Sequence, residues 1–210
     1  DVYKRQEYDN FNAASAKIEL RGKSIHPGTA KGQMVNAALV AMELHGLLPA
    51  LETPYYTEKY EGFYHLVAMR GETEQAELQY IIRDHDRAKF EARKAVMEKA
   101  CAEIDRRYGA GTAALTLRDS YYNMKEKIAP CMFLIENAKK AMESVGVTPK
   151  VVPIRGGTDG ATLSYMGLPC PNLGTGGFNY HGPCEGITVE AMDKATEILL
   201  NLADIYKDVQ

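Results

Sequence analysis

The chain has 210 residues, which is enough for one large domain or two small ones with a substantial core. Its 25 basic and 28 acidic side chains give a formal net charge of −3, which argues against nucleic acid or an anionic membrane as a partner. No stretch approaches the roughly 20 apolar residues of a membrane span. The opening row DVYKRQEYDN also lacks the apolar segment of a signal peptide, so we expect a cytoplasmic location.

A strand and a helix open the first predicted domain. From Ser15 the row SAKIELRGKS alternates apolar and polar side chains, as a half-buried strand does. After the turn-forming row HPGTAKG, the apolar residues of MVNAALVAMELHGLL recur at helical spacing and predict a helix over 34–48. The opening DVYKRQ matches nothing structural around it and is similar to translated adaptor read-through, so we leave it outside the predicted fold.

A hairpin, a long helix and a last strand complete this domain. The rows GFYHLVAMRGE and EQAELQYIIRD both alternate and are separated by a short polar turn, which indicates a hairpin. Residues 86–108 carry an apolar stripe at helical spacing, and a last strand runs over 113–117. The order β-α-β-β-α-β over 13–122 predicts a four-stranded antiparallel sheet with both helices on one face.

The pattern changes after Tyr122. A helix is expected near 131–145, followed by the short strand VVPI, the loop RGGTDG, a short helix and the strand PCPNL. The loop GTGGFNYHGPCEG then leads to a final helix, with Thr188 as its predicted N-cap. Alternating helices and strands indicate α/β layering, but about two strands are too few for a sheet covered on both faces. Residues 123–210 therefore read as an incomplete α/β unit.

Two glycine-rich loops in this second unit hold candidate site residues. The backbone amides of RGGTDGA, between a strand and a helix, are suited either to binding an anion or to plain turn structure. His181 lies in the second loop, four residues before Glu185. A histidine there is either a metal ligand or an uninvolved loop residue, and no further histidine or carboxylate cluster stands near it in the sequence.

Two residues of the first domain are also candidates. His26 follows the first strand and precedes a helix, where a histidine is commonly a plain surface residue. Arg83 lies near the end of an apolar strand, where a cation needs a partner. Either Asp84 or Asp86 pairs with it, or it meets an anionic ligand.

Several long rows resemble one enzyme family. They are FNAAS, HPGTAKG with MVNA, EGFYHL, YIIRDHDR, DSYYNM, PIRGGTDGA, MGLPCPNL and NYHG with its following glutamate, and together they cover about 7–207. These rows are similar to those of tripeptide aminopeptidases in the two-zinc metallopeptidase family, which also contains carboxypeptidase G, aminoacylase and succinyl-diaminopimelate desuccinylase. The resemblance implies a zinc-bearing α/β catalytic domain, interrupted by an α+β lid domain that mediates homodimer formation.

The resemblance also implies roles for named residues. His181 matches a metal-ligand histidine, and His26 matches a lid histidine that stabilises the oxyanion in the partner's active site. Arg83 is similar to a lid arginine that holds a substrate carboxylate. Gly157 and Thr158 match the loop that lines the substrate cleft, with Arg155 beside them.

The family's other zinc ligands and its general base belong to an N-terminal half, and no HxD motif occurs in this chain. The resemblance therefore implies a C-terminal fragment whose site for two zinc ions per subunit is incomplete, and which is inactive alone. Residues 1–12 would be an artefactual start and the end of a catalytic segment. Residues 13–122 would be the lid, and 123–210 the C-terminal part of the catalytic domain.

Two alternatives stay open at this point. The first is a dipeptidase or acyl-amino-acid hydrolase of the same family, acting on a different small substrate. The second is a dimerisation module without catalysis. An RNA-binding module of similar fold is disfavoured, because the chain is acidic and has no aromatic and basic RNA-binding motif.

Overall fold

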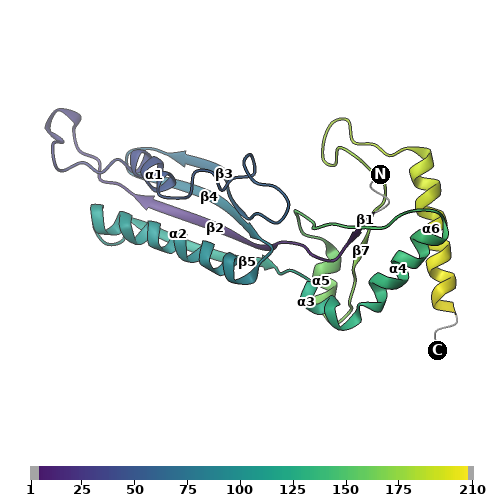
Figure 1. The fold of residues 1–210 in the computed structure, drawn as a ribbon. Coiled ribbons are helices and arrows are strands. Elements are labelled where there is room, and N and C mark those ends of the chain that lie inside the picture. The colour runs from purple at the N-terminus through teal and green to yellow at the C-terminus, as the bar shows by residue number, and fades with distance from the viewer. Residues whose placement is uncertain (1–4, 208–210) are drawn as a thin grey trace. The chain divides into compact units, whose positions relative to one another are not determined.

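The computed structural model describes residues 5–207 and divides the chain into two compact units. The inserted unit spans Phe11–Tyr122. The host unit combines residues 5–10 with residues 123–207, so the chain leaves it once and returns once (Figure 1). The two units are described separately below.

The inserted unit contains one antiparallel sheet and two long helices. The strands are β2 (Asn12–Arg21), β3 (Phe63–Gly71), β4 (Gln75–Asp84) and β5 (Ala113–Tyr121), in the order β3-β4-β2-β5. The helices α1 (Ala37–Gly46) and α2 (Arg87–Tyr108) cover one face of this sheet (Figure 1). The predicted four-stranded sheet with both helices on one face is therefore confirmed.

The core of the inserted unit follows from the two periodicities of the sequence. Alternate strand residues point toward the helices, and helix residues three or four apart point back at the sheet. The side chains that meet there are 2% exposed or less and include Ile18, Leu20, Leu78, Tyr80 and Ile82 from the strands and Val40, Leu44, Phe90, Met97 and Ile104 from the helices.

Side-chain caps determine where the two helices begin. The amide oxygen of Asn36 accepts the N–H groups of Ala38 at 3.0 Å and Leu39 at 3.3 Å. The predicted helix over 34–48 therefore starts later, after this cap. Asp86 accepts the N–H of Lys89 at 2.8 Å and starts α2, close to the predicted boundary.

The host unit is built on a short three-stranded sheet in the order β6-β1-β7. Its strands are β1 (Arg5–Glu7), β6 (Lys150–Val151) and β7 (Asn172–Leu173). The strand β1 is central, parallel to β6 and antiparallel to β7, and its Gln6 is fully buried. The exclusion of DVYKRQ from the fold is therefore wrong for Arg5 and Gln6, whereas residues 1–4 lie outside the described part.

The host unit also contains helices. They are α3 (Lys125–Ile128), α4 (Phe133–Ser144), α5 (Asp159–Tyr165) and α6 (Val189–Lys207). Pro130 lies in a 3-10 turn, η3 (Ala129–Cys131), between α3 and α4, because proline has no N–H for a continuous helix. Thr188 accepts the N–H of Ala191 at 3.2 Å, which confirms it as the cap of α6. No helix within residues 5–207 is long and apolar enough to cross a membrane.

Candidate functional site

His26 lies in the loop that connects β2 to α1. Its Nδ1 accepts the N–H of Gly28 at 3.2 Å, at the start of the 3-10 turn η2 (Pro27–Thr29). Because Nδ1 is an acceptor there, the neutral imidazole carries its proton on Nε2. His26 is exposed, so it presents an N–H donor at the surface of the inserted unit.

Arg83 lies at the end of β4, on the sheet face away from the helices. Its Nη1 donates to the carbonyl of Ala14 at 3.1 Å and to that of Ile82 at 2.9 Å. The guanidinium also lies over the ring of Tyr121, 5.6 Å from the ring centre. Sequence reasoning did not include Tyr121, although the row DSYYNM that contains it carries part of the resemblance.

The alternative that Arg83 pairs with Asp84 or Asp86 is wrong. Successive strand residues point to opposite faces, and Asp84 points inward to Arg93, with 2.8 Å between Oδ2 and Nε. Asp86 caps α2 instead. Within residues 5–207 no carboxylate forms an ion pair with Arg83, so its remaining N–H groups are available to an anionic ligand.

Arg83 lies beside the start of β2, whereas His26 follows the end of that strand. Arg83 pairs with Ala13 of β2, and His26 follows Arg21 at the other end of that strand. The eight steps from residue 13 to residue 21 span about 26 Å at roughly 3.3 Å per residue. A tripeptide spans only about 10 Å, so the two side chains of one inserted unit do not reach one substrate together.

The loop 155–158 of the host unit follows the segment that pairs with residues 5–10. Thr158 Oγ1 accepts the N–H of Ala161 at 3.3 Å and caps α5, so the loop has the turn role that the sequence left open. A side chain at Gly160 would place its Cβ 2.3 Å from the carbonyl of Cys170. Glycine therefore lets α5 approach the strand segment closely, while Arg155 is half-buried and Gly157 is exposed.

His181 lies in the long loop between β7 and α6. Its φ angle of +64° is in the left-handed region, which non-glycine residues seldom adopt. Its backbone N–H donates to Oε2 of Glu185 at 2.9 Å, so Glu185 holds this turn. No hydrogen bond or ion pair within residues 5–207 uses the exposed imidazole of His181.

The described residues do not complete a metal site by themselves. Zinc takes about four ligands in proteins. The part of the chain from 5 to 207 contains no group of three or more histidine, cysteine, aspartate or glutamate side chains that could hold a metal ion.

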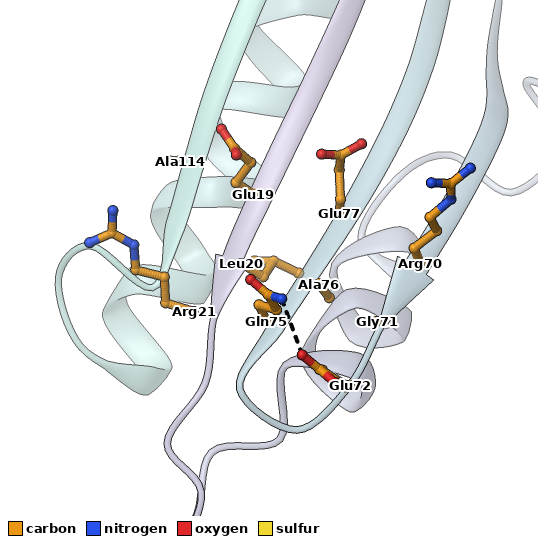
Figure 2. Close-up of a pocket in the computed structure, with 10 residues that line it drawn as sticks. All are labelled: Glu19, Leu20, Arg21, Arg70, Gly71, Glu72, Gln75, Ala76, Glu77 and Ala114. Atoms are coloured by element: carbon orange, nitrogen blue, oxygen red, sulfur yellow. Dashed lines mark hydrogen bonds between the residues drawn. The ribbon is translucent and has the colours of Figure 1, made fainter.

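A hollow of about 660 Å³ lies over the open sheet face of the inserted unit (Figure 2). It is lined by charges of both signs, among them Glu19, Glu77 and Arg70, and Gln75 donates to Glu72 at 3.1 Å on its rim. None of the six predicted site residues lines it. The hollow is therefore a feature of the exposed sheet rather than of the predicted site.

Comparison with known proteins shows that this chain is similar to peptidases. The family model of the peptidase dimerisation domain matches residues 8–112. Peptidase T of Alkaliphilus oremlandii is 56% identical over 200 residues, which are 95% of this chain and 49% of that protein. Peptidase T of Bacillus subtilis is 53% identical over 201 residues, 96% of this chain and 49% of that protein. The chain spans about half the length of these relatives.

Two solved structures share the fold. An aminopeptidase PepT from Bacillus cereus has a TM-score of 0.80 at 24% identity, covering 95% of this chain and 53% of that one. A tripeptidase from Staphylococcus aureus has a TM-score of 0.79 at 17% identity, covering 96% of this chain and 53% of that one. These similarities extend over both the inserted and the host unit.

Proposed function

Because this chain belongs to the peptidase family that carries the peptidase dimerisation domain, we propose that it forms part of a zinc-dependent tripeptide aminopeptidase similar to peptidase T. The inserted unit is the lid, and the host unit is the C-terminal part of the catalytic domain. The observation that carries this proposal is the 56% identity over 95% of the chain, which includes both units. A dimerisation module alone would require similarity only in the inserted unit.

In this proposal the two lid residues act on the substrate from different subunits. Arg83 binds the terminal carboxylate of the peptide through its remaining N–H groups. His26 donates its Nε2 proton to the oxyanion that forms at the scissile carbonyl. The separation of about 26 Å along β2 supports a homodimer in which His26 serves the second subunit's substrate.

The surface of the lid supports this homodimer. The strand β3 is one edge of the sheet, so its outer backbone groups are open to pairing. Beside it, α1 exposes Leu39 at 61% and Met42 at 60%, and β3 exposes Val67 at 55%. An apolar helix face next to an open strand suits pairing with a second copy.

The host unit contributes to the catalytic cleft. The loop with Arg155, Gly157 and Thr158 lines the substrate side, and its geometry is fixed by the capped start of α5. His181 supplies one ligand to a site for two zinc ions per subunit. The other ligands and the general base come from outside residues 5–207, so the 210 residues alone are inactive. The enzyme acts on peptides in the cytoplasm.

A chimaeric enzyme tests the proposal. Residues 7–207 would replace the matching part of Bacillus subtilis peptidase T, with the unaltered Bacillus enzyme as the control for its N-terminal half. We expect release of the N-terminal residue from trialanine at least about tenfold faster than hydrolysis of dialanine. Faster hydrolysis of dialanine identifies a dipeptidase, and hydrolysis of N-acetylalanine identifies an acyl-amino-acid hydrolase. A folded dimer without activity on any of these supports the dimerisation module.

A further inference from the structure

A groove runs between α2 and β5, at the sheet edge opposite β3. Two hollows of about 360 and 430 Å³ lie along it and share Glu98 and Leu117 in their walls. The side of α2 that faces the groove has small residues, Ala95, Cys101 and Ala102, and these leave room beside the strand. The proposed dimer surface does not use this edge.

The backbone of β5 is open on its outer side. The N–H of Arg21 donates to the carbonyl of Thr112 at 2.9 Å, so Thr112 directs its backbone groups toward β2. In an antiparallel pair, every second residue does so and the residues between them face the other way. Leu115 and Leu117 therefore direct their N–H and C=O groups away from β2, toward the edge. Of the outward amides, that of Ala113 is bound by Asp105 Oδ1 at 2.8 Å. No backbone partner for Leu115 or Leu117 lies on that side within residues 5–207.

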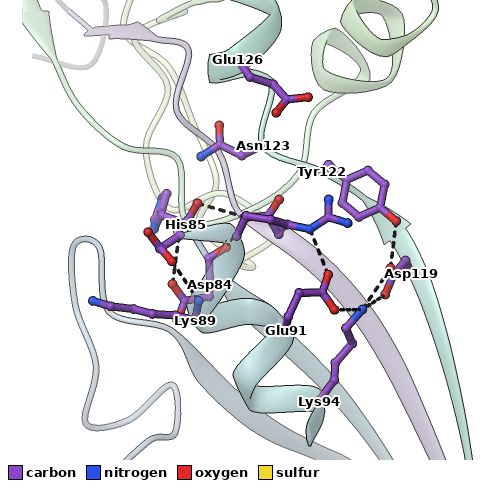
Figure 3. Close-up of polar contacts among 12 residues, drawn as sticks. Asp84, His85, Lys89, Glu91, Lys94, Asp119, Tyr122, Asn123 and Glu126 are labelled. Carbon is purple, nitrogen blue, oxygen red and sulfur yellow. Dashed lines mark hydrogen bonds and ion pairs between the residues drawn. The ribbon is translucent and has the colours of Figure 1, made fainter.

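The charged groups of the groove are acidic in excess. Among the residues that the structure describes, its walls carry Glu91, Glu98, Asp105 and Asp119 and one cation, Lys94. Lys94 contacts Asp119 at 3.0 Å and Glu91 at 2.7 Å and is thereby neutralised (Figure 3). Glu98 forms no hydrogen bond or ion pair with any described residue and lies where the two hollows meet. The carboxylate of Glu98, at the centre of the groove, is thus available to a cation of a bound partner.

We propose that the α2–β5 groove binds an extended, basic peptide segment of another protein by strand addition. The segment pairs with the free backbone groups of Leu115 and Leu117. Every second side chain then enters the groove, because strand residues alternate between the two faces. A lysine or arginine faces Glu98, and apolar side chains two residues away contact Leu115 and Leu117. This interaction is separate from peptide hydrolysis.

The test uses the full chain labelled with ¹⁵N and the peptide acetyl-Val-Thr-Lys-Thr-Val-amide, in which the lysine and both valines share one face of the strand. Its blocked ends exclude aminopeptidase action. We expect the amide signals of Leu115 and Leu117 to shift and to exchange with solvent at least about tenfold more slowly at saturating peptide. The same peptide with glutamate for lysine, or with N-methyl groups on alternate residues, should not bind.

Variants identify the contact that confers the preference for a basic segment. Glu98→Gln should weaken binding about tenfold, whereas Glu74→Gln, an exposed acid on the β3–β4 turn, should leave it unchanged. Equal binding of the glutamate peptide, equal affinity of the two variants, or unshifted Leu115 and Leu117 amides would overturn the proposal. So would slow solvent exchange of the Leu115 and Leu117 amides in the peptide-free dimer, which would show that a second copy of the chain covers β5.

Discussion

Asp84 and Arg93 form a buried ion pair that joins the end of β4 to α2. Oδ2 of Asp84 accepts from Nε of Arg93 at 2.8 Å, and the two side chains are 2% and 13% exposed. Asp84 also accepts the N–H of Asp86 at 3.0 Å, and Arg93 contacts Glu52. The pair lies one residue from Arg83, so it steadies the strand end that presents the proposed carboxylate-binding side chain.

Removing this carboxylate should destabilise the inserted unit. Asp84→Ala leaves the charge of Arg93 without its buried partner, and we expect a loss of about 3 kcal/mol in the free energy of unfolding. Urea unfolding followed by circular dichroism measures the change. Glu74→Ala removes an exposed carboxylate that has no side-chain partner within residues 5–207, and it should change the free energy of unfolding by less than about 0.5 kcal/mol. Equal losses for both variants would contradict the importance of the pair.

Gly62 offers a second way to disturb the same pair. A Cβ there would lie 2.2 Å from Oδ2 of Asp84 and 2.6 Å from Nε of Arg93. Gly62→Ala should therefore cost about 1–3 kcal/mol. Gly46→Ala is the matched control, because no atom of the described chain lies within 4 Å of the added Cβ, and it should be neutral or slightly stabilising. In the Asp84→Ala background the cost of Gly62→Ala should shrink, as expected for coupled neighbours.

Mixed dimers test the separation of His26 from Arg83. In the chimaeric enzyme, His26→Ala and Arg83→Ala should each abolish most of the activity. When the two variants are co-expressed, half of the sites in each mixed dimer combine an intact Arg83 with an intact His26. We expect about a quarter of the unmutated activity to return. If both residues serve the same subunit's substrate, co-expression restores nothing.

The zinc content of the chimaeric enzyme tests the proposed role of His181 as a metal ligand. His181→Ala in the chimaeric enzyme should lower the zinc content by about one ion per subunit, since a ligand is lost from one site. His65→Ala removes an exposed histidine of the inserted unit and should leave the zinc content unchanged. Elemental analysis of the purified dimers gives the answer, and identical zinc contents would refute the assignment.

The partly exposed Glu103 of α2 predicts a dependence of stability on pH. Hydrogen bonds from Arg106 and Arg107 lower the pKa of Glu103 to about 2. A carboxyl group with a depressed folded pKa stabilises the protein above its unfolded pKa, about 4.3, and loses this effect as pH falls toward 2. Glu103→Gln should thus lower the urea midpoint at pH 6 and match the unmutated chain near pH 2. A difference that grows toward low pH would contradict this sign.

Most of the inserted unit follows from local patterns. Apolar and polar residues alternate along its strands, and apolar residues recur at helical spacing along its helices. Both patterns identify the side of each element that packs into the core. The predicted start of α1 is too early, because Met34 continues the apolar spacing whereas Asn36 caps the helix after it. Here a capping side chain outweighed the hydrophobic pattern.

The sheet of the host unit was harder to predict. The row RQE in β1 has no apolar alternation, yet Gln6 is fully buried between β6 and β7. Its partners are more than 140 residues away in the sequence, so no local signal indicates the pairing. That Arg83 does not pair with Asp84, by contrast, can be predicted from the sequence. Successive strand residues point to opposite faces of the sheet, so Asp84 lies on the face away from Arg83.

The register between β2 and β5 brings the two ends of the inserted unit together. Ala13 pairs with Tyr121, so the chain enters and leaves the inserted unit at neighbouring positions. In the host unit, the side chain of Asn10 accepts the N–H of Met124 at 2.8 Å, which joins the two ends of the interruption. A module whose ends meet on both sides of the junction can be gained, lost or exchanged in evolution without reordering the strands of its host.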